Sequence, residues 1–131
     1  MRKIIFRGKN PVGNWEYGLV HISGGQAFIT GINGGLCAEV DHETVGQYTG
    51  VFAKDGKYIY EGDIIRAVLP ATEVCREFVW PLMAVAFHDG AFGVWQSQRE
   101  FTPLRSFASR VEFTVVGNIH DNHDMLEVQH G

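Results

Sequence analysis

The sequence lacks the features of an exported, disulfide-stabilised or membrane-spanning chain. Its two cysteines, Cys37 and Cys75, lie outside any Cys-x-x-Cys or Cys/His ligand spacing, so they predict neither a disulfide framework nor a structural zinc. The longest apolar run, residues 78–87, is interrupted by Pro81 and is about half of the ~20 residues that a spanning helix needs. The apolar run near the N-terminus ends at Arg7, too early for a signal peptide. We expect a soluble cytoplasmic protein that does not bind a membrane.

An excess of positive charge is also lacking. The chain has 11 Lys plus Arg against 15 Asp plus Glu, a formal net charge of −4. No global field would therefore attract a polyphosphate backbone, and binding of nucleic acid would need a local patch. With 45% hydrophobic and 20% charged residues in 131, the composition is that of an ordinary globular domain.

Long apolar helical stripes are missing, whereas glycine is abundant. Sixteen of 131 residues are glycine, about 12% against a usual ~7%, and they separate short apolar segments as turns do. We predict an all-β, small barrel-like fold in one domain of residues 1–131. Its predicted parts are an N-terminal β-meander over about residues 1–40, one short helical turn near 41–46, a barrel part over about 57–118 and a polar tail at 119–131.

Turn signals set the outline of this fold. The Gly-Gly pairs at 24–25 and 34–35 lie between apolar segments and open no helix, so they predict hairpin turns and not phosphate-binding loops. Asp41 is a good N-cap for the helical turn. Asp55 and Gly56 suit the two positive φ angles of a type I′ hairpin turn. Residues 77–87 predict one long strand that bends at Pro81.

One stretch interleaves aromatic rings with cations. Its members are Trp95, Arg99, Phe101, Arg105, Phe107 and Arg110. Rings beside arginines are how single-stranded nucleic acid is held without sequence preference, so these residues are a candidate contact surface for nucleic acid or another partner. The alternative is ordinary loop packing, in which the rings cover a barrel end and the arginine heads lie in water. The nearby Glu100 and Glu112 dilute the positive charge.

The tail concentrates side chains that coordinate divalent metals. They are His120, Asp121, His123 and Asp124, with His130 beyond. A helix would align His120 with Asp124 and a strand would align Asp121 with His123, and one segment cannot adopt both conformations. We predict a solvated, turn-rich tail that needs no metal, and we expect no cofactor.

No catalytic set is recognisable. Ser23, Ser106 and Ser109 lack the strand-to-helix turn that exposes a nucleophilic serine, and neither cysteine has a motif around it. We therefore predict no catalytic residues and a protein that is not an enzyme. A metal-assisted hydrolase built on the tail residues is the last-ranked alternative.

The segment Tyr60, Glu61, Gly62 and Asp63 precedes a strand rich in β-branched residues. A glycine that permits a sharp entry and an aspartate that accepts backbone donors are typical of a chain that enters a small barrel. Asp63 is therefore predicted to fix a turn and not to act as a catalytic acid.

Five segments give the chain a family resemblance. They are Ile4 to Lys9, Trp15 to Gly18, Glu43 to Gly50, Asp55 to Arg66 and Val115 to Asn122. In this order they resemble the YopX family of small proteins, encoded largely by phages and prophages of bacteria. The resemblance implies a mostly β fold with barrel-like parts and assigns Gly50 to a structural motif. It implies no activity and no ligand residues. Members commonly have an aromatic where His120 stands and a proline where His123 stands.

These observations lead to a ranked set of functions. The first is a non-catalytic phage or prophage accessory protein that binds a host or phage protein, because loops and barrel surfaces are present without a catalytic set. The second is a single-stranded nucleic acid binding protein that uses the residues from Trp95 to Arg110. Short strands leave open edges, so we also expect a homo-oligomer.

Overall fold

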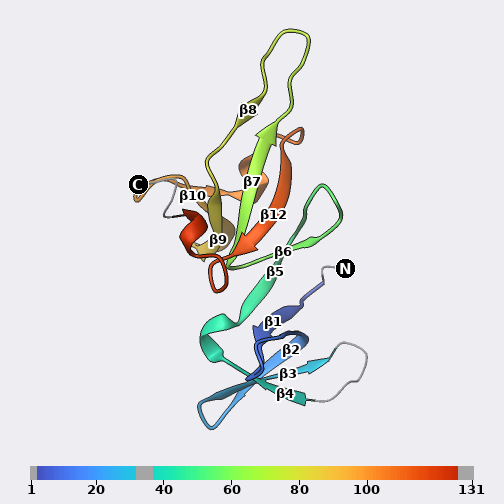
Figure 1. The fold of residues 1–131 in the computed structure, drawn as a ribbon, viewed down its shortest axis with the longest axis vertical. Helices are drawn as coiled ribbons and strands as arrows, with labels where there is room; N and C mark the ends of the chain where they lie inside the picture. Colours follow the sequence, from blue (N-terminus) through green and yellow to red (C-terminus); the bar gives the residue numbers. More distant parts are fainter. Residues whose placement is uncertain (1–2, 32–36, 127–131) are drawn as a thin grey trace. The chain divides into compact units, whose positions relative to one another are not determined.

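The computed structural model describes residues 3–31 and 37–126. Two compact units divide the chain after Gly50, and we call residues 1–50 unit 1 and residues 51–131 unit 2. Each unit is built on antiparallel β-structure (Figure 1). The predicted all-β fold is confirmed. No helix among the described residues has the length and apolar character needed to cross a membrane.

The strands and 3-10 turns follow one another in a regular series. In unit 1 they are β1 (Phe6–Lys9), β2 (Trp15–Ser23), β3 (Gln26–Gly31), β4 (Cys37–Val40), the 3-10 turn η1 (His42–Thr44) and β5 (Gly46–Phe52), whose last two residues belong to unit 2. In unit 2 they are β6 (Tyr58–Tyr60), β7 (Asp63–Leu69), β8 (Phe78–Val79), β9 (Met83–His88), β10 (Ala91–Trp95), β11 (Phe101–Pro103), η2 (Leu104–Ser106) and β12 (Glu112–Asn118). Residues 124–126 are helical.

Unit 1 contains the predicted meander, with strand order β4-β3-β2-β1-β5. The Gly24-Gly25 hairpin turn is confirmed, because both glycines have positive φ, at 60° and 80°. The pair at 34–35 lies outside the described residues. Strand β5 was not predicted, and it pairs with β1 through Phe6 and Arg7.

The apolar side chains of unit 1 gather on one face of its sheet. Ala27, Ile29 and Val40 are buried, and Val20 and Val45 pack against them. The predicted short helical turn is η1, which follows this cluster in the chain. The Asp41 carboxylate Oδ1 accepts a hydrogen bond from the Glu43 amide at 3.0 Å, as expected of an N-cap.

Unit 2 contains a curled half-barrel with strand order β11-β10-β9-β7-β12, and β8 also pairs with β7 (Figure 1). The single long strand predicted over residues 77–87 is instead two strands, and Pro81 lies in the break between them. On one side of it β8 pairs with Val68 and Leu69, and on the other side β9 pairs with Ile64 and Ile65. Two successive strands, β8 and β9, therefore both pair with β7. Pro81, which has no backbone N–H to donate, lies between them, where no hydrogen bond to β7 is needed.

The two Asp-Gly turns of unit 2 differ from each other. Gly56 has a φ of 89°, but Asp55 does not have a positive φ, so the predicted type I′ turn at this position is wrong. The Gly56 amide donates to the Ala53 carbonyl at 2.9 Å, so the turn runs from Ala53 to Gly56. Within this turn only its last residue, Gly56, has a positive φ. Positive φ at both residues occurs instead at Asp89 and Gly90, with 50° and 79°.

The half-barrel encloses the larger hydrophobic core. Its buried members are Ala53, Ile59, Ile65, Ala67, Met83, Val85, Val94, Leu104 and Phe113. Three aromatic rings form a chain at its margin, since Trp80 lies 4.7 Å from the exposed Phe78 and 5.3 Å from Phe107 between ring centroids. These contacts place the stretch around Phe107 against the core.

Candidate functional site

A pocket lies on the outward face of strands β9, β10 and β11. Because side chains alternate along a strand, Val85 and Val94 point into the core while His88 and Trp95 lie on the opposite face. Phe101 of β11 stands directly opposite Trp95 in the register and therefore shares that face. Three aromatic side chains from three adjacent strands thus meet outside the core.

The floor of this pocket depends on a glycine. A Cβ at Gly93 would lie 2.4 Å from the Thr102 carbonyl oxygen and 2.7 Å from Cζ of Phe101. Any larger residue would push β11 and the Phe101 ring away, so glycine permits the close approach of strand and ring. Ala91, whose side chain is a single methyl group, is one of the residues that line the pocket.

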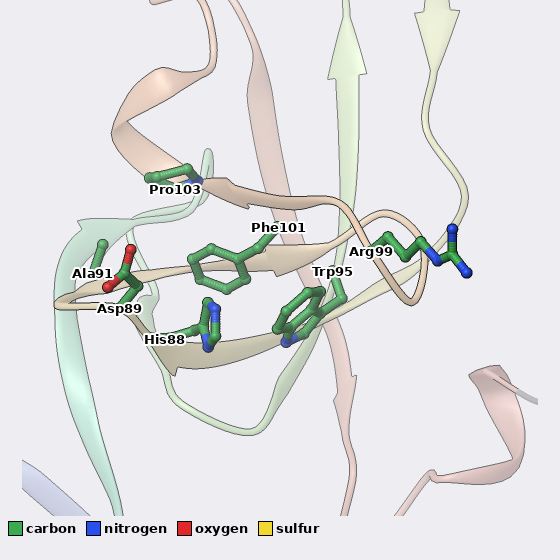
Figure 2. A pocket seen from close by; sticks show the side chains of 7 residues that line it. All are labelled: His88, Asp89, Ala91, Trp95, Arg99, Phe101 and Pro103. Atoms are coloured by element: carbon green, nitrogen blue, oxygen red, sulfur yellow. The ribbon is translucent and has the colours of Figure 1, made fainter.

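The three rings are tilted against one another. The ring centroids of His88 and Trp95 are 4.7 Å apart at 55°, those of His88 and Phe101 5.1 Å apart at 64°, and those of Trp95 and Phe101 5.1 Å apart at 61°. Such edge-to-face contacts are favourable between aromatic rings and hold each one in place. We call His88, Trp95 and Phe101 the aromatic triad. It lines a pocket of about 330 Å³ (Figure 2).

Two opposite charges flank the aromatic triad. Figure 2 shows the Asp89 carboxylate beside the rings, at the end near Ala91. The Arg99 side chain lies at the opposite end, beyond Trp95, and its guanidinium points away from the rings. The Asp89 backbone is set by the turn between β9 and β10. The loop that carries Arg99 is held by Gln96, whose side-chain Nε2 donates to Thr102 Oγ1 at 2.7 Å.

The structure brings together only part of the predicted contact surface. Trp95, Arg99 and Phe101 line the pocket. Arg105 lies in η2 and Arg110 follows it, and both are exposed without lining this pocket. Phe107 packs on the core, with its ring centroid 5.4 Å from that of Phe113.

Besides Pro103, the sequence interpretation missed three pocket residues around one turn, His88, Asp89 and Ala91. The signal that could have found them is the two-residue turn itself, because it makes His88 and Ala91 a cross-strand pair and places His88 on the face of Trp95.

The Tyr60 to Asp63 motif has the geometry of a structural turn. The Asp63 carboxylate is 2% exposed, and its Oδ2 accepts a hydrogen bond from the Tyr60 amide at 2.8 Å. Gly62 has a φ of 90°, donates its amide to the Val85 carbonyl and accepts the Ile119 amide, both at 2.8 Å. The turn between β6 and β7 is thereby tied to β9 and to the end of β12. Glu61 is partly buried in this turn.

Gly50, which the family resemblance assigns to a structural motif, has a φ of 87°, and this conformation favours glycine. No heavy atom lies within 4 Å of the position that a Cβ would take there. Its role is therefore one of backbone conformation and not of close packing.

The tail residues are organised by asparagines. The Asn118 side-chain oxygen accepts the His120 and Asp121 amides at 3.0 Å each, and its Nδ2 donates to the Asp121 carboxylate at 3.0 Å. Across the described part of the chain, no three His, Cys, Asp or Glu side chains gather as metal ligands, those of His123 and Asp124 included. His130 lies outside the described residues.

A second hollow, of about 300 Å³, lies in unit 1 and is lined by Lys9, Asn10, Pro11, Gly13, Asp41 and Thr44. Its polar groups bond to one another. The Asn10 side-chain oxygen accepts the Val12 and Asn14 amides, and the Thr44 hydroxyl accepts the Lys9 amide at 2.8 Å. These bonds fix the loop between β1 and β2.

Comparison with known proteins supports the fold and the lineage. One solved structure that resembles the chain is the crystal structure of protein EF1440 from Enterococcus faecalis. It has a TM-score of 0.52 and 19% sequence identity, over 96% of this chain and 99% of that chain. At this identity the likeness concerns the fold alone. No curated protein matches the chain. The family model described as YopX protein matches residues 20–127, so this chain belongs to the YopX family.

Proposed function

We propose that this protein is a non-catalytic accessory protein of a phage or prophage, and that it binds a macromolecule in the bacterial cytoplasm through the aromatic pocket. The observation that carries the proposal is the aromatic triad itself. Trp95 is 40% exposed although it lies in the middle of a ring cluster, and Phe101 and His88 also reach the surface. Exposed aromatic clusters beside polar groups are typical of binding surfaces, where tryptophan is a frequent energetic anchor.

A protein partner fits the charge better than a nucleic acid. In the sequence, residues 51–131 have seven basic and eleven acidic side chains, so unit 2 alone has a formal net charge of −4. A polyanion would be repelled by this field, whereas a neutral or basic protein surface would not. The partner is therefore a host or phage protein.

The test is affinity capture from phage-infected bacterial cells with the full chain as bait. We expect a specific protein to be retained by the unmodified chain and lost with Trp95→Ala. Leu19→Ala, an exposed position in unit 1, is the matched control and should retain it. A partner captured equally by both variants, or none at all, would contradict the proposal.

Single-stranded nucleic acid is the second candidate, because Trp95, Arg99 and Phe101 all line one pocket. Filter binding of labelled single-stranded DNA and RNA at two salt concentrations tests it. Tight binding that weakens steeply as salt rises and is lost with Arg99→Ala would favour this candidate over a protein partner. The metal-assisted hydrolase ranks last, since the described tail residues do not gather as ligands.

Self-association is part of the same proposal. Strand β12 is seven residues long and stands at the end of the strand order in unit 2, and β4 does so in unit 1. Open strand edges pair readily with identical chains. Sedimentation at micromolar concentration should show a mass above 14.6 kDa, and a monomer would rule out the homo-oligomer.

A further inference from the structure

We propose that the aromatic pocket takes the cationic head of one basic side chain, an arginine or a lysine, from an exposed segment of the partner protein. This inference rests on the proposed function and names the chemistry of its binding site. Three features of the pocket lead to it: the tilt of the rings, the position of the charges, and the form of the neighbouring sheet edge.

The ring geometry suits a compact cation. A cation is attracted to an aromatic face when it lies within about 6 Å of the ring centroid. Because the three centroids are only 4.7–5.1 Å apart, one charged group above the aromatic triad can lie within that limit of all three. A guanidinium or an ammonium over the face of Trp95 can therefore lie close to His88 and Phe101 as well.

The same geometry is unfavourable for a nucleobase. A base stacks by laying its flat face parallel to a ring. The planes of the aromatic triad are inclined to one another by 55° to 64°, so a base parallel to one ring is tilted from the other two. At most one ring can stack fully on it, and the remaining rings contribute only edge contacts.

The charges around the pocket are complementary to a cation. The Asp89 carboxylate lies beside the rings, where it can pair with a basic head, and the Arg99 guanidinium points away from them (Figure 2). The type I′ turn at Asp89 and Gly90 fixes the backbone that carries this carboxylate. The net charge of −4 on unit 2 adds a long-range attraction for a basic surface.

The sheet edge favours a single anchoring side chain over a paired strand. Strand β11 beside the pocket has only three residues and ends in Pro103, which cannot donate a ladder hydrogen bond. Main-chain addition of a partner strand is therefore disfavoured there. A volume of about 330 Å³ is at the small end of ligand sites and accommodates one side-chain head.

The test is an NMR titration of the full chain with two acetylated, amidated pentapeptides. One is Gly-Gly-Arg-Gly-Gly, and the other has citrulline in place of arginine, which keeps the shape and removes the charge. The Trp95 indole N–H signal, assigned by its loss in Trp95→Phe, reports on the pocket. The indole signals of Trp15 and Trp80 are internal controls and should stay in place.

We expect the arginine peptide to shift the Trp95 signal with an affinity about two- to fivefold higher than that of the citrulline peptide, the ratio given by a cation–π gain of about 0.5–1 kcal/mol. Asp89→Asn, which keeps the turn residue's size, should reduce this preference. Arg99→Ala removes a like charge from the pocket lining and should increase the preference for arginine. Equal affinity for both peptides, or an unchanged preference in Asp89→Asn, would overturn the inference.

A third probe, hexathymidylate, tests whether the pocket binds single-stranded nucleic acid instead. If it shifts the Trp95 signal at lower concentration than the arginine peptide, and Arg99→Ala abolishes that shift, the pocket binds nucleic acid and the inference is wrong. Failure of the inference about a basic side chain is distinguishable from failure of the proposed function. Trp95-dependent capture without a preference for arginine removes only the inference, and a preference for arginine without such capture removes only the proposed function.

Discussion

The two units of this chain organise their buried residues by different means. The main cluster of unit 1 has three buried apolar side chains among its described residues, Ala27, Ile29 and Val40, whereas that of unit 2 has nine. Unit 1 adds close contacts at two glycines, of the kind that unit 2 has at Gly93. A Cβ at Gly8 would lie 2.9 Å from Val40 Cγ2, and one at Gly18 would lie 1.9 Å from the Thr30 carbonyl oxygen.

Each unit also buries a charged residue, Arg7 in unit 1 and Asp63 in unit 2. Arg7 is 6% exposed, and its guanidinium carbon lies 4.2 Å from the centroid of the Trp15 ring. The units therefore differ mainly in buried apolar volume, and in unit 1 the buried charge is stacked on an aromatic ring. Side-chain volume should therefore matter more in unit 2 than in unit 1.

The largest expected effect is truncation in the core of unit 2. Ile65 is fully buried between neighbours from several strands, and Ile65→Ala should lower the free energy of unfolding by about 3–5 kcal/mol, because the cavity cannot collapse. Urea unfolding of the full chain measures it. Val74→Ala, at a position that is 90% exposed, is the control and should change the value by less than about 0.5 kcal/mol.

Ile29→Ala makes the corresponding change in unit 1. Ile29 is 1% exposed but belongs to the smaller cluster, so the loss should be nearer the low end of the usual range, about 2–3 kcal/mol. The same urea experiment compares the two variants directly. A loss greater than that of Ile65→Ala would show that volume matters as much in unit 1, and the comparison would fail.

Much of this architecture could be predicted from the sequence. Glycine spacing located the meander, and Pro81 located the break between β8 and β9, because both depend on backbone properties of single residues. Strand β5 was missed. Two glycines and polar residues lower its apparent strand preference, and its pairing with β1 and β6 stabilises it.

The candidate site could be predicted only in part. Trp95, Phe101 and Phe107 recur at intervals of six, which suggests one shared face. The 3-10 turn η2 lies between Phe101 and Phe107 and redirects the chain, so that Phe107 packs on the core instead. His88 shares the face of Trp95 because the two-residue turn at Asp89 and Gly90 fixes the register of the hairpin, a consequence of the turn that the sequence interpretation did not draw.

The turn before β7 tests the polar side of unit 2. Asp63→Ala leaves the buried Tyr60 amide without its carboxylate acceptor and should lower the free energy of unfolding by about 1–3 kcal/mol. Asp63→Asn keeps an oxygen at the same place and should cost less in the same urea experiment. If both variants lose the same amount, the hydrogen bond to Tyr60 is not the reason.

A smaller effect is expected from Gly93→Ala. The added Cβ meets the Thr102 carbonyl oxygen and the Phe101 ring, so β11 must shift, at a cost of about 1–2 kcal/mol in unfolding free energy. The Trp95 indole signal should move as well. Gly90→Ala is the control, since no heavy atom lies within 4 Å of its Cβ position and only its positive φ is strained. An unmoved Trp95 signal in Gly93→Ala would show that the geometry of the pocket does not depend on the close contact at Gly93.

The smallest expected effect is that of metal. Small domains often use a metal where apolar burial is insufficient, but nine buried apolar side chains make that unnecessary in unit 2. The Asn118 side chain already holds the turn at His120 and Asp121, and a metal site would have to rearrange these bonds before its ligands could gain energy. Zinc should therefore leave the Tm of the full chain unchanged in calorimetry, and His123→Ala should have no effect on the Tm with or without zinc.

Truncation after Asn122 is the sharper variant, because it removes His123, Asp124 and His130 and keeps the hydrogen bond from the Asn118 amide to Asn122 Oδ1. A rise of many degrees with zinc in the full chain, absent from this truncation, would show that unit 2 depends on a metal as small cores do.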